Sequence, residues 1–201
     1  DYITEGHALK GVLKADMENI RSTMEKIDYN TFEDVVNNIF AAKRIYIIGL
    51  RSSMALAEFL GFYLNIILQN VKTVGYGISD IFEQMINVGE GDLVIGIGFP
   101  RYASRTIDAL AFAQDRGATV VAVTDSFLSP LAARADYSLI AQSNMASFVD
   151  SLVAPLSVIN ALIIAVGMRE KENISSTFNS LEEIWREYNV YSYNNRNVGD
   201  D

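Results

Sequence analysis

A strand, a glycine and a long apolar helix follow one another at residues 44–60, RIYIIGLRSSMALAEFL, and this order constrains the fold more than any other feature of the chain. The apolar, β-branched run at its start is typical of a buried strand. Gly49 ends that run, and a polar loop with Arg51, Ser52 and Ser53 leads into the helix. The first amide groups of a helix lack partners within the helix and carry partial positive charge. The order therefore predicts an anion site at this loop.

The loop 49–53 contains a single glycine. A dinucleotide-binding turn needs a second glycine for the close approach of the pyrophosphate. The loop therefore favours phosphate or a similar small anion as its ligand, and not a dinucleotide. The alternative is that Ser52 or Ser53 only caps the following helix, which serine favours. The two roles can coexist, with one serine in each.

Apolar strand-like segments alternate with helical patterns over residues 44–169. We expect strands at 44–48, 71–76, 93–97, 119–123 and 137–140. We expect helices at 53–69, 79–86, 104–116, 130–134 and 147–169, with Ser79 as a cap and Gly117 just beyond the third of them. This alternation predicts the α/β class, with a doubly wound, five-stranded parallel sheet and helices on both faces.

Helices are also expected outside this alternating region. They span 9–27, 31–42 and 175–188. Thr31 and Asp34 form a loose capping box at the start of the second of these helices. Residues 189–201 are polar and are expected to fray. We divide the chain into a helical linker or extension (1–42), the α/β domain (43–170) and a C-terminal helix with a tail (171–201).

The loop after the third expected strand, GFPRYASRT at 98–106, has the same polar and basic character as the first loop. It offers charge, a phenol and hydroxyls from Arg101, Tyr102, Ser104, Arg105 and Thr106. For either arginine alone, a solvated surface position is the alternative. Ligands of doubly wound sheets bind beyond the carboxyl ends of the strands, where strand order reverses. We therefore expect both loops to face one crevice, where the planar arginine fork suits phosphate.

The balance of charges limits the classes of partner. The chain has 16 Lys and Arg against 25 Asp and Glu, but residues 41–170 carry nine and eleven and are nearly neutral. An acidic chain is a poor nucleic-acid binder, because that affinity comes largely from neutralised phosphates. The absence of cysteine excludes a disulfide framework and fits a cytoplasmic location. Neither a signal peptide nor a comfortable membrane span is evident, so no membrane partner is expected.

The helical segments 53–69 and 152–168 are apolar on all sides. A helix with this pattern is expected to be buried all round. One domain of this size does not easily bury two such helices, so we expect a homodimer or higher homo-oligomer with these helices near the interface. The alternative is a central helix packed inside a larger monomer core.

Three runs of the chain resemble the SIS (sugar isomerase) domain, and most closely the effector domain of RpiR-type bacterial transcriptional regulators. They are IIGLRSS with its helix, GDLVIGIGFPRYASRT, and VVAVTDSFLSPLAARADYSLIA, and the resemblance covers about residues 35–170. It implies a doubly wound sheet, sugar-phosphate binding and dimerisation through helices. In the family the phosphate is held by a serine of the first loop, which Ser53 matches, and by a Ser-x-Ser-Gly-x-Thr loop, whose end Thr106 matches.

The chain departs from the family pattern in both loops. Arg51 stands where many members have glycine, and a longer Pro-Arg-Tyr-Ala-Ser-Arg-Thr run replaces the Ser-Gly-x-Thr core. Both changes add arginine, which indicates an anion, phosphate or carboxylate, that is recognised partly through arginine. Family regulators also carry a helix-turn-helix domain. This chain starts without Met on what resembles the linker helix, so DNA binding is expected only in a part that it does not contain.

An isomerase of this family needs a positioned base to move a proton between adjacent carbons. Glu58, one turn beyond the first loop, is a candidate for the base or for a hydrogen-bond partner of Arg51. The other candidates are weaker, because His7 precedes the first helix, Glu83 and Glu90 qualify by position alone, and Asp125 and Asp150 serve equally well as helix caps. Because no acid/base pair stands out, we predict no catalytic residue, metal ligand or cofactor.

We therefore favour an effector-sensing domain over a sugar-phosphate isomerase or an amino-sugar-phosphate processing enzyme. A dimerisation domain with a vestigial site is a third interpretation. The predicted ligand-binding residues are Gly49, Arg51, Ser52, Ser53, Arg101, Tyr102, Ser104 and Thr106, and the further candidates are Glu58, Arg105, Ser147 and Ser151.

Overall fold

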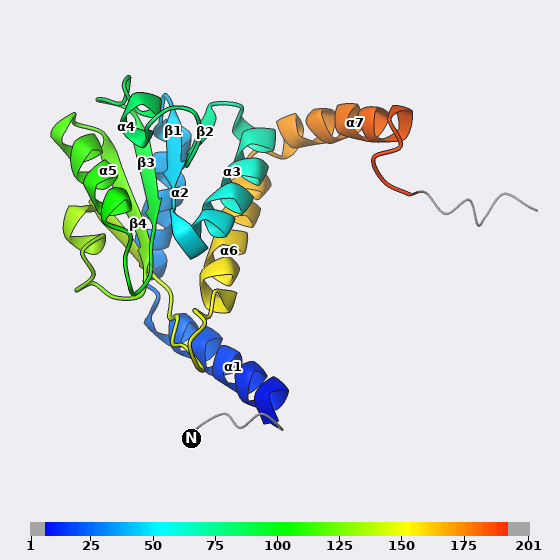
Figure 1. Cartoon of the computed structure of the whole chain (residues 1–201). Coiled ribbons are helices and arrows are strands. Elements are labelled where there is room, and N and C mark those ends of the chain that lie inside the picture. Colours follow the sequence, from blue (N-terminus) through cyan, green and yellow to red (C-terminus); the bar gives the residue numbers. More distant parts are fainter. Residues whose placement is uncertain (1–6, 193–201) are drawn as a thin grey trace, which may run out of the picture.

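Five parallel strands form the centre of the molecule in a computed structural model that describes residues 7–192 (Figure 1). The strands are β1 (Ile45–Ile48), β2 (Val71–Val74), β3 (Leu93–Ile97), β4 (Thr119–Thr124) and β5 (Tyr137–Ile140). They lie in the order β2-β1-β3-β4-β5. The register pairs Ile45 of β1 with Val71 on one side and with Leu93 on the other. The predicted α/β class and the five-stranded parallel sheet are confirmed.

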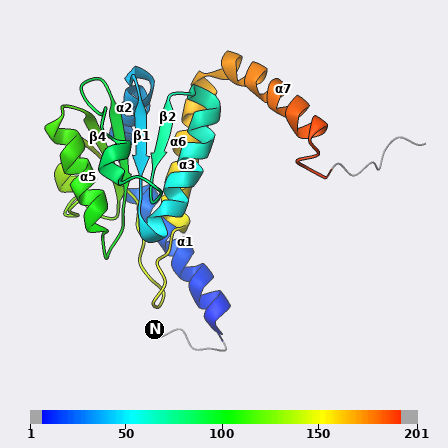
Figure 2. The same ribbon diagram turned by 45° about the horizontal axis from the view of Figure 1, so that its top comes forward.

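Helices cover both faces of the sheet, because the strand side chains alternate between two separate cores. Ile45 and Ile47 enter one core with α2 (Tyr29–Ala41), α3 (Met54–Leu68) and α6 (Val153–Arg169). Tyr46 and Ile48 enter the other core, with α4 (Ile81–Gln84), α5 (Ser104–Asp115) and Leu131, which precedes the short 3-10 helix η3 (Ala132–Arg134). Figure 2 shows α3 and α6 side by side on the first face, with α5 on the other.

Strand β2 ends earlier than its apolar pattern predicts. The strand was expected to reach Tyr76, but it stops at Val74. The side-chain amide of Gln84, at the end of α4, accepts from the Gly75 amide (3.3 Å) and donates to the Gly75 carbonyl (2.7 Å). A side chain therefore takes the partners that a longer strand would use.

Carboxylates explain two of the helix starts that differ from the predicted ones. Asp28, and not Thr31, caps α2, because its side chain accepts from two backbone amides of the first turn. Asp80, and not Ser79, caps α4 in a reciprocal pair with Glu83. In contrast, the predicted glycine beyond α5 is confirmed, since Gly117 has a φ of 77°.

Helix α6 begins at Val153 and not at Ser147. Pro155 is the third residue of the observed helix. Proline is tolerated in the first helical turn but breaks a helix interior, where it removes a hydrogen bond and clashes with the preceding turn. A start at Ser147 would have put Pro155 in the interior, so residues 147–152 form a loop instead.

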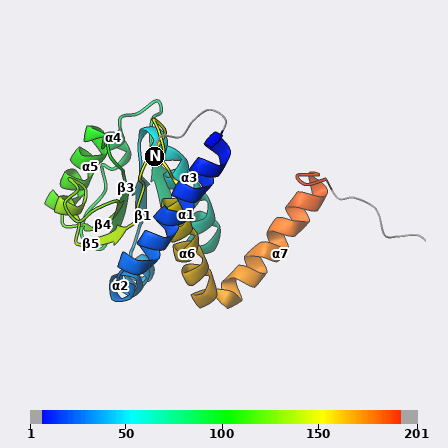
Figure 3. The same cartoon turned by 90° about the horizontal axis from the view of Figure 1, so that it is seen from below.

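Two helices project from the body at opposite ends. Helix α1 (Ala8–Lys26) crosses below the sheet and lies beside α6, whereas α7 (Lys171–Glu187) leads away from the end of α6 (Figures 1 and 3). Helix α7 starts four residues before its predicted start at Ser175. The fraying expected for 189–201 falls mostly outside the described residues.

The two apolar helices are not buried all round within one chain. Phe62 of α3 is 59% exposed, and Ile164 and Met168 of α6 are about equally exposed. The inner residues of both helices, among them Leu60 and Leu162, are fully buried. The alternative of helices packed inside a larger monomer core is therefore wrong, because the single chain leaves these apolar side chains uncovered.

Candidate functional site

Two loops meet at the point where strand order reverses. Chain order runs outward from β1 to β2 on one side and to β3 and β4 on the other, so the ends of β1 and β3 flank the crevice. The loop after β1 folds into a 3-10 helix, η2 (Arg51–Ser53). It turns back so sharply that a Cβ on Gly49 would lie 2.7 Å from the Ser53 carbonyl oxygen. Only glycine fits there, so Gly49 shapes the site.

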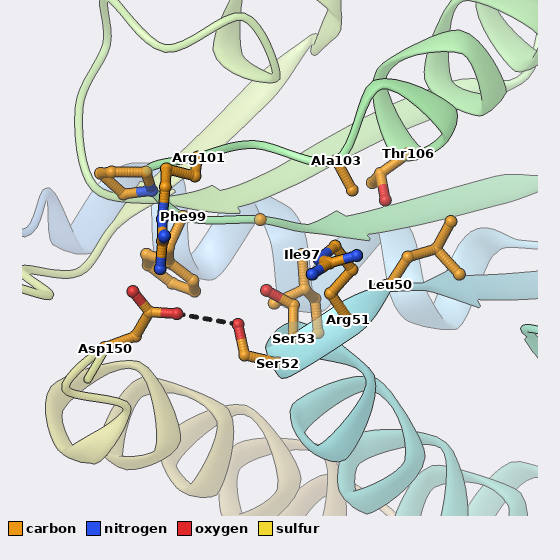
Figure 4. A pocket seen from close by; sticks show the side chains of 12 residues that line it. Leu50, Arg51, Ser52, Ser53, Ile97, Phe99, Arg101, Ala103, Thr106 and Asp150 are labelled. Carbon is orange, nitrogen blue, oxygen red and sulfur yellow. Dashed lines mark hydrogen bonds between the residues drawn. The ribbon is translucent and has the colours of Figure 1, made fainter. Parts of the chain in front are cut away.

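A cavity of about 150 Å³ lies between the two loops (Figure 4). Its polar lining comes from Arg51, Ser52, Ser53, Arg101, Thr106 and Asp150. Its apolar walls come from Leu50, Ile97, Phe99, Pro100 and Ala103. Figure 4 shows Thr106 and Leu50 on one side and Asp150 and Phe99 on the other, with Arg51 and Ser53 between them. The prediction that both loops face one crevice is confirmed.

Both loop arginines have a left-handed backbone. Arg51 has a φ of 58° and Arg101 a φ of 59°, a region that costs a residue with a side chain about 1–3 kcal/mol. Both side chains are exposed at the cavity, and within residues 7–192 neither forms an ion pair. Arg44, in contrast, is bound to Asp92. The cavity therefore holds two unneutralised cations on strained backbone.

Two buried hydroxyls line the same cavity. Ser53 is 5% exposed and Thr106 is 1% exposed. The Thr106 Oγ1 atom is buried and has no hydrogen-bond partner among the described residues. An unpaired buried hydroxyl is unfavourable because it has lost its water without replacement. Ser53 makes no capping bond to α3, so the interpretation of Ser53 as a simple helix cap is wrong.

Asp150 is a polar lining residue that is not among the site residues predicted from the sequence. Its Oδ2 accepts a hydrogen bond from the Ser52 hydroxyl at 3.0 Å. The α6 cap position is Leu152, with no side-chain bond, so the interpretation of Asp150 as a helix cap is wrong. The signal that could have found it is Pro155, because an α6 that starts late leaves Asp150 in a loop beyond the end of β5.

The other predicted residues of the second loop do not line the cavity. The Tyr102 hydroxyl donates to Asp125 at 2.8 Å, and burial together with this bond raises the pKa of Tyr102 to about 12. Arg105 forms an ion pair with Asp80. Ser104 is an exposed residue at the start of α5.

The remaining candidates lie apart from the cavity. Glu58 is exposed on α3. Ser147 lies in the loop beside α1, and the Ser151 hydroxyl donates to Asp16 of α1 at 2.6 Å. His7 precedes α1 and does not line the cavity. Within the described chain, no three His, Asp or Glu side chains are grouped to hold a metal, and no helix is both long and apolar enough to cross a membrane.

The fold defines a doubly wound α/β domain with its crevice at the switch point of the sheet. A family model described as "SIS domain" matches residues 38–165, and the chain belongs to this family. The sugar isomerase domain of an RpiR transcription factor from Sphaerobacter thermophilus is 31% identical, with a TM-score of 0.81 over 86% of this chain and 96% of that one. The chain is thus homologous to the corresponding domain of RpiR-type regulators.

Two further proteins are similar to the chain. The NanR protein of Vibrio vulnificus, solved in complex with ManNAc-6P, shares the fold, with a TM-score of 0.76, 17% identity, and coverage of 92% of this chain and 70% of that one. An HTH-type transcriptional regulator of Haemophilus influenzae is 28% identical over 180 residues. That match covers 88% of this chain but only 61% of the regulator, so the chain spans less than two thirds of this relative.

Proposed function

We propose that the cavity binds a sugar phosphate or a related anion as the effector of a bacterial RpiR-type regulator. The observation that carries the proposal is the joint presence of two unpaired arginines and an unpartnered buried hydroxyl in one cavity at the switch point. A phosphate offers several charged acceptor oxygens, and bonds from arginine and hydroxyl groups to such acceptors are the strong ones. The relative that binds ManNAc-6P supports the class of ligand.

Both loops would contribute charge and hydrogen-bond donors to ligand binding. Arg51 and Arg101 supply charge, and Ser53 and Thr106 supply donors at the buried end. The cavity is small beside a sugar phosphate, so the sugar would extend toward the wider opening that Tyr76 also lines.

The test is thermal unfolding of the chain with hexose and pentose phosphates, N-acetylated amino-sugar phosphates and sugar acids. A ligand at about 100 times its dissociation constant adds roughly 2.7 kcal/mol to the free energy of unfolding. This raises Tm by about 5–11 °C for a chain of this size. Arg101→Ala should abolish the shift, whereas Arg134→Ala, which removes an exposed arginine outside the cavity, should retain it. Equal shifts in both variants would refute the site.

One observation favours a sugar-phosphate isomerase or an amino-sugar-phosphate processing enzyme as the second candidate. Asp150 is the one carboxylate that lines the cavity within the described residues, and a carboxylate can act as a general base. NMR of the ligand after prolonged incubation with the protein separates the two functions. An unchanged ligand supports the sensor, and a converted ligand establishes an enzyme.

We also propose that the chain forms a homodimer or higher oligomer through α3 and α6. The exposed apolar side chains of these helices, including Phe62, Ile164 and Met168, support this assembly. Light scattering after gel filtration gives the mass. Phe62→Glu should reduce the mass to that of one chain, while Phe127→Glu, at a phenylalanine elsewhere that is at least as exposed, should not. A stable dimer that binds none of the panel would favour the dimerisation domain.

The remaining proposals concern the whole protein. Binding to DNA would belong to a helix-turn-helix part outside this chain, as the HTH-type relative suggests. The regulator would act in the cytoplasm. Within the chain, residues 1–42 would serve as the linker, 43–170 as the SIS domain, and 171–201 as a C-terminal helix and tail.

A further inference from the structure

The loop between β5 and α6, residues 141–152 and here named the strap, is bound to one face of α1. Asp16, Asn19 and Thr23 of α1 are spaced by three and four residues, so they share a face of the helix. Asn19 is 1% exposed and Thr23 is 5% exposed, although α1 exposes large apolar side chains such as Leu9 and Met17. The face of α1 that the protein buries is therefore partly polar, and it lies against the strap.

Four hydrogen bonds join the strap to α1. The backbone amide of Gln142 donates to the Thr23 hydroxyl (2.8 Å). The Asn19 side-chain amide donates to the carbonyl of Asn144 (3.0 Å) and accepts from its backbone N–H (3.2 Å). The Ser151 hydroxyl donates to the Asp16 carboxylate (2.6 Å). These bonds are directional, so a small movement of the strap breaks them.

The same strap also bonds to the first loop of the cavity and, through Asp125, to the second. Asp150, the neighbour of Ser151, accepts from Ser52 of the first loop. The Gln142 side chain donates to the carbonyl of Asp125 (3.1 Å), whose carboxylate holds Tyr102 of the second loop. The strap is therefore a direct connection between the cavity and α1.

The strap has room to move. A hollow of about 430 Å³ separates part of it from α1, lined by Ala8, Val12 and the strap residues 146–152 among others. Phe148 of the strap is 81% exposed and Val149 is 61% exposed, so their side chains do not anchor it in the core. Segments with few buried apolar contacts open at low free-energy cost.

We propose that an anion in the cavity loosens the strap from α1, so that α1 reports on occupancy of the site. The inference rests on the proposed function. Phosphate oxygens compete with Asp150 for the Ser52 hydroxyl and place negative charge beside its carboxylate. Withdrawal of Asp150 moves the adjacent Ser151 and weakens its bond to Asp16. Such coupling is reciprocal: if the anion favours the loosened strap, loosening the strap must favour the anion.

The test uses the full chain with inorganic phosphate at millimolar concentration, against chloride at equal ionic strength. Calorimetry measures the phosphate affinity, and hydrogen exchange measures the opening of α1. We expect phosphate to speed amide exchange in α1 by about fivefold or more, the lower end of typical coupling between sites. Ser151→Ala should tighten phosphate binding although Ser151 does not line the cavity, and Asp16→Ala should act alike.

Two matched variants control for general loosening. Ser151→Thr retains the hydroxyl and should restore the affinity of the unaltered chain. Ser157→Ala removes an exposed hydroxyl that bonds within α6, to the Val153 carbonyl, and should change neither measurement. Phosphate binding with unchanged or slower exchange in α1, or weaker binding in Ser151→Ala, would overturn the coupling while the site stands. Absence of any phosphate binding would overturn the site and the coupling together.

Discussion

Replacement of Thr106 by valine separates the requirements of folding from those of binding. The Thr106 hydroxyl is buried, lines the cavity and has no partner in the described chain. Valine has nearly the same shape and no group to satisfy. Leaving a buried donor unpaired costs about 1–3 kcal/mol, so its removal should increase the free energy of unfolding by about 1–2 kcal/mol. For a chain of this size, that gain raises Tm by about 2–8 °C.

The same replacement should weaken ligand binding. A hydrogen bond to a charged acceptor contributes about 1.5–3 kcal/mol. Its loss therefore raises the dissociation constant of a sugar phosphate by about 10- to 150-fold. Urea unfolding of the free protein and calorimetry with the ligand measure the two effects on one sample. We expect the replacement to raise the free energy of unfolding and to lower the affinity for the ligand, because Thr106 would contribute to binding at the expense of stability.

Thr124→Val is the matched control. Thr124 is also fully buried, but its hydroxyl donates to the Asp125 carboxylate at 3.2 Å. Its replacement removes a bond and should lower the free energy of unfolding by about 1 kcal/mol. If Thr106→Val destabilised the free protein as Thr124→Val does, the hydroxyl would be satisfied in solution. If it left the affinity unchanged, Thr106 would not contact the ligand.

Three further predictions follow from single residues. Arg51→Gly should abolish anion binding in calorimetry without loss of Tm, because glycine adopts a φ of 58° freely. A large fall in Tm would show instead that Arg51 stabilises the fold. Gly61→Ala should lower the free energy of unfolding, measured in urea, by about 1–3 kcal/mol, because the added Cβ would lie 2.0 Å from Thr73 Oγ1. Gly77→Ala is the control and should leave the free energy of unfolding nearly unchanged, because no atom lies within 4 Å of its added Cβ. The pKa of Tyr102 is raised to about 12, so the stability that its neutral phenol contributes is complete below pH 10 and is lost between pH 10 and 12. Tyr102→Phe should therefore remove this part of the alkaline fall in Tm. An unchanged dependence of Tm on pH would contradict the raised pKa of Tyr102.

The parts of the fold that the sequence predicts depend on side-chain periodicity. Strands β1 and β3 consist of apolar residues that are all buried, and their ends lie within one residue of the predicted limits. Parallel pairing and covered faces follow, because a strand without a polar side needs helices over both faces. The crevice between the two loops then follows from the topology alone.

The parts that the sequence does not predict depend on competition between near neighbours. Asp28 and Thr31 are both good caps, and only the backbone geometry decides that the carboxylate takes the amides. Tyr102 has the chemistry of a ligand contact, but Asp125 at the end of the next strand binds it first. Asp150 enters the cavity because a proline three residues into α6 moves the start of that helix.

The strongest evidence for a site is that three departures from good folding coincide in one cavity. These departures are a left-handed arginine, an unpaired exposed cation and an unpaired buried hydroxyl, and none of them stabilises the fold. Each could be removed by a single substitution, such as Arg51→Gly or Thr106→Val. Arg44, in contrast, meets the buried Asp92. Asn70 has a buried unpaired oxygen and Gln69 a left-handed backbone, but these two residues carry no charge and do not line the cavity. Real proteins violate the rules of local consistency mainly at functional sites. An anion would resolve the two electrostatic departures at once, since it pairs the cations and accepts from the hydroxyl. The strain at Arg51 and Arg101 would remain, as the means by which the loops aim both side chains at the ligand.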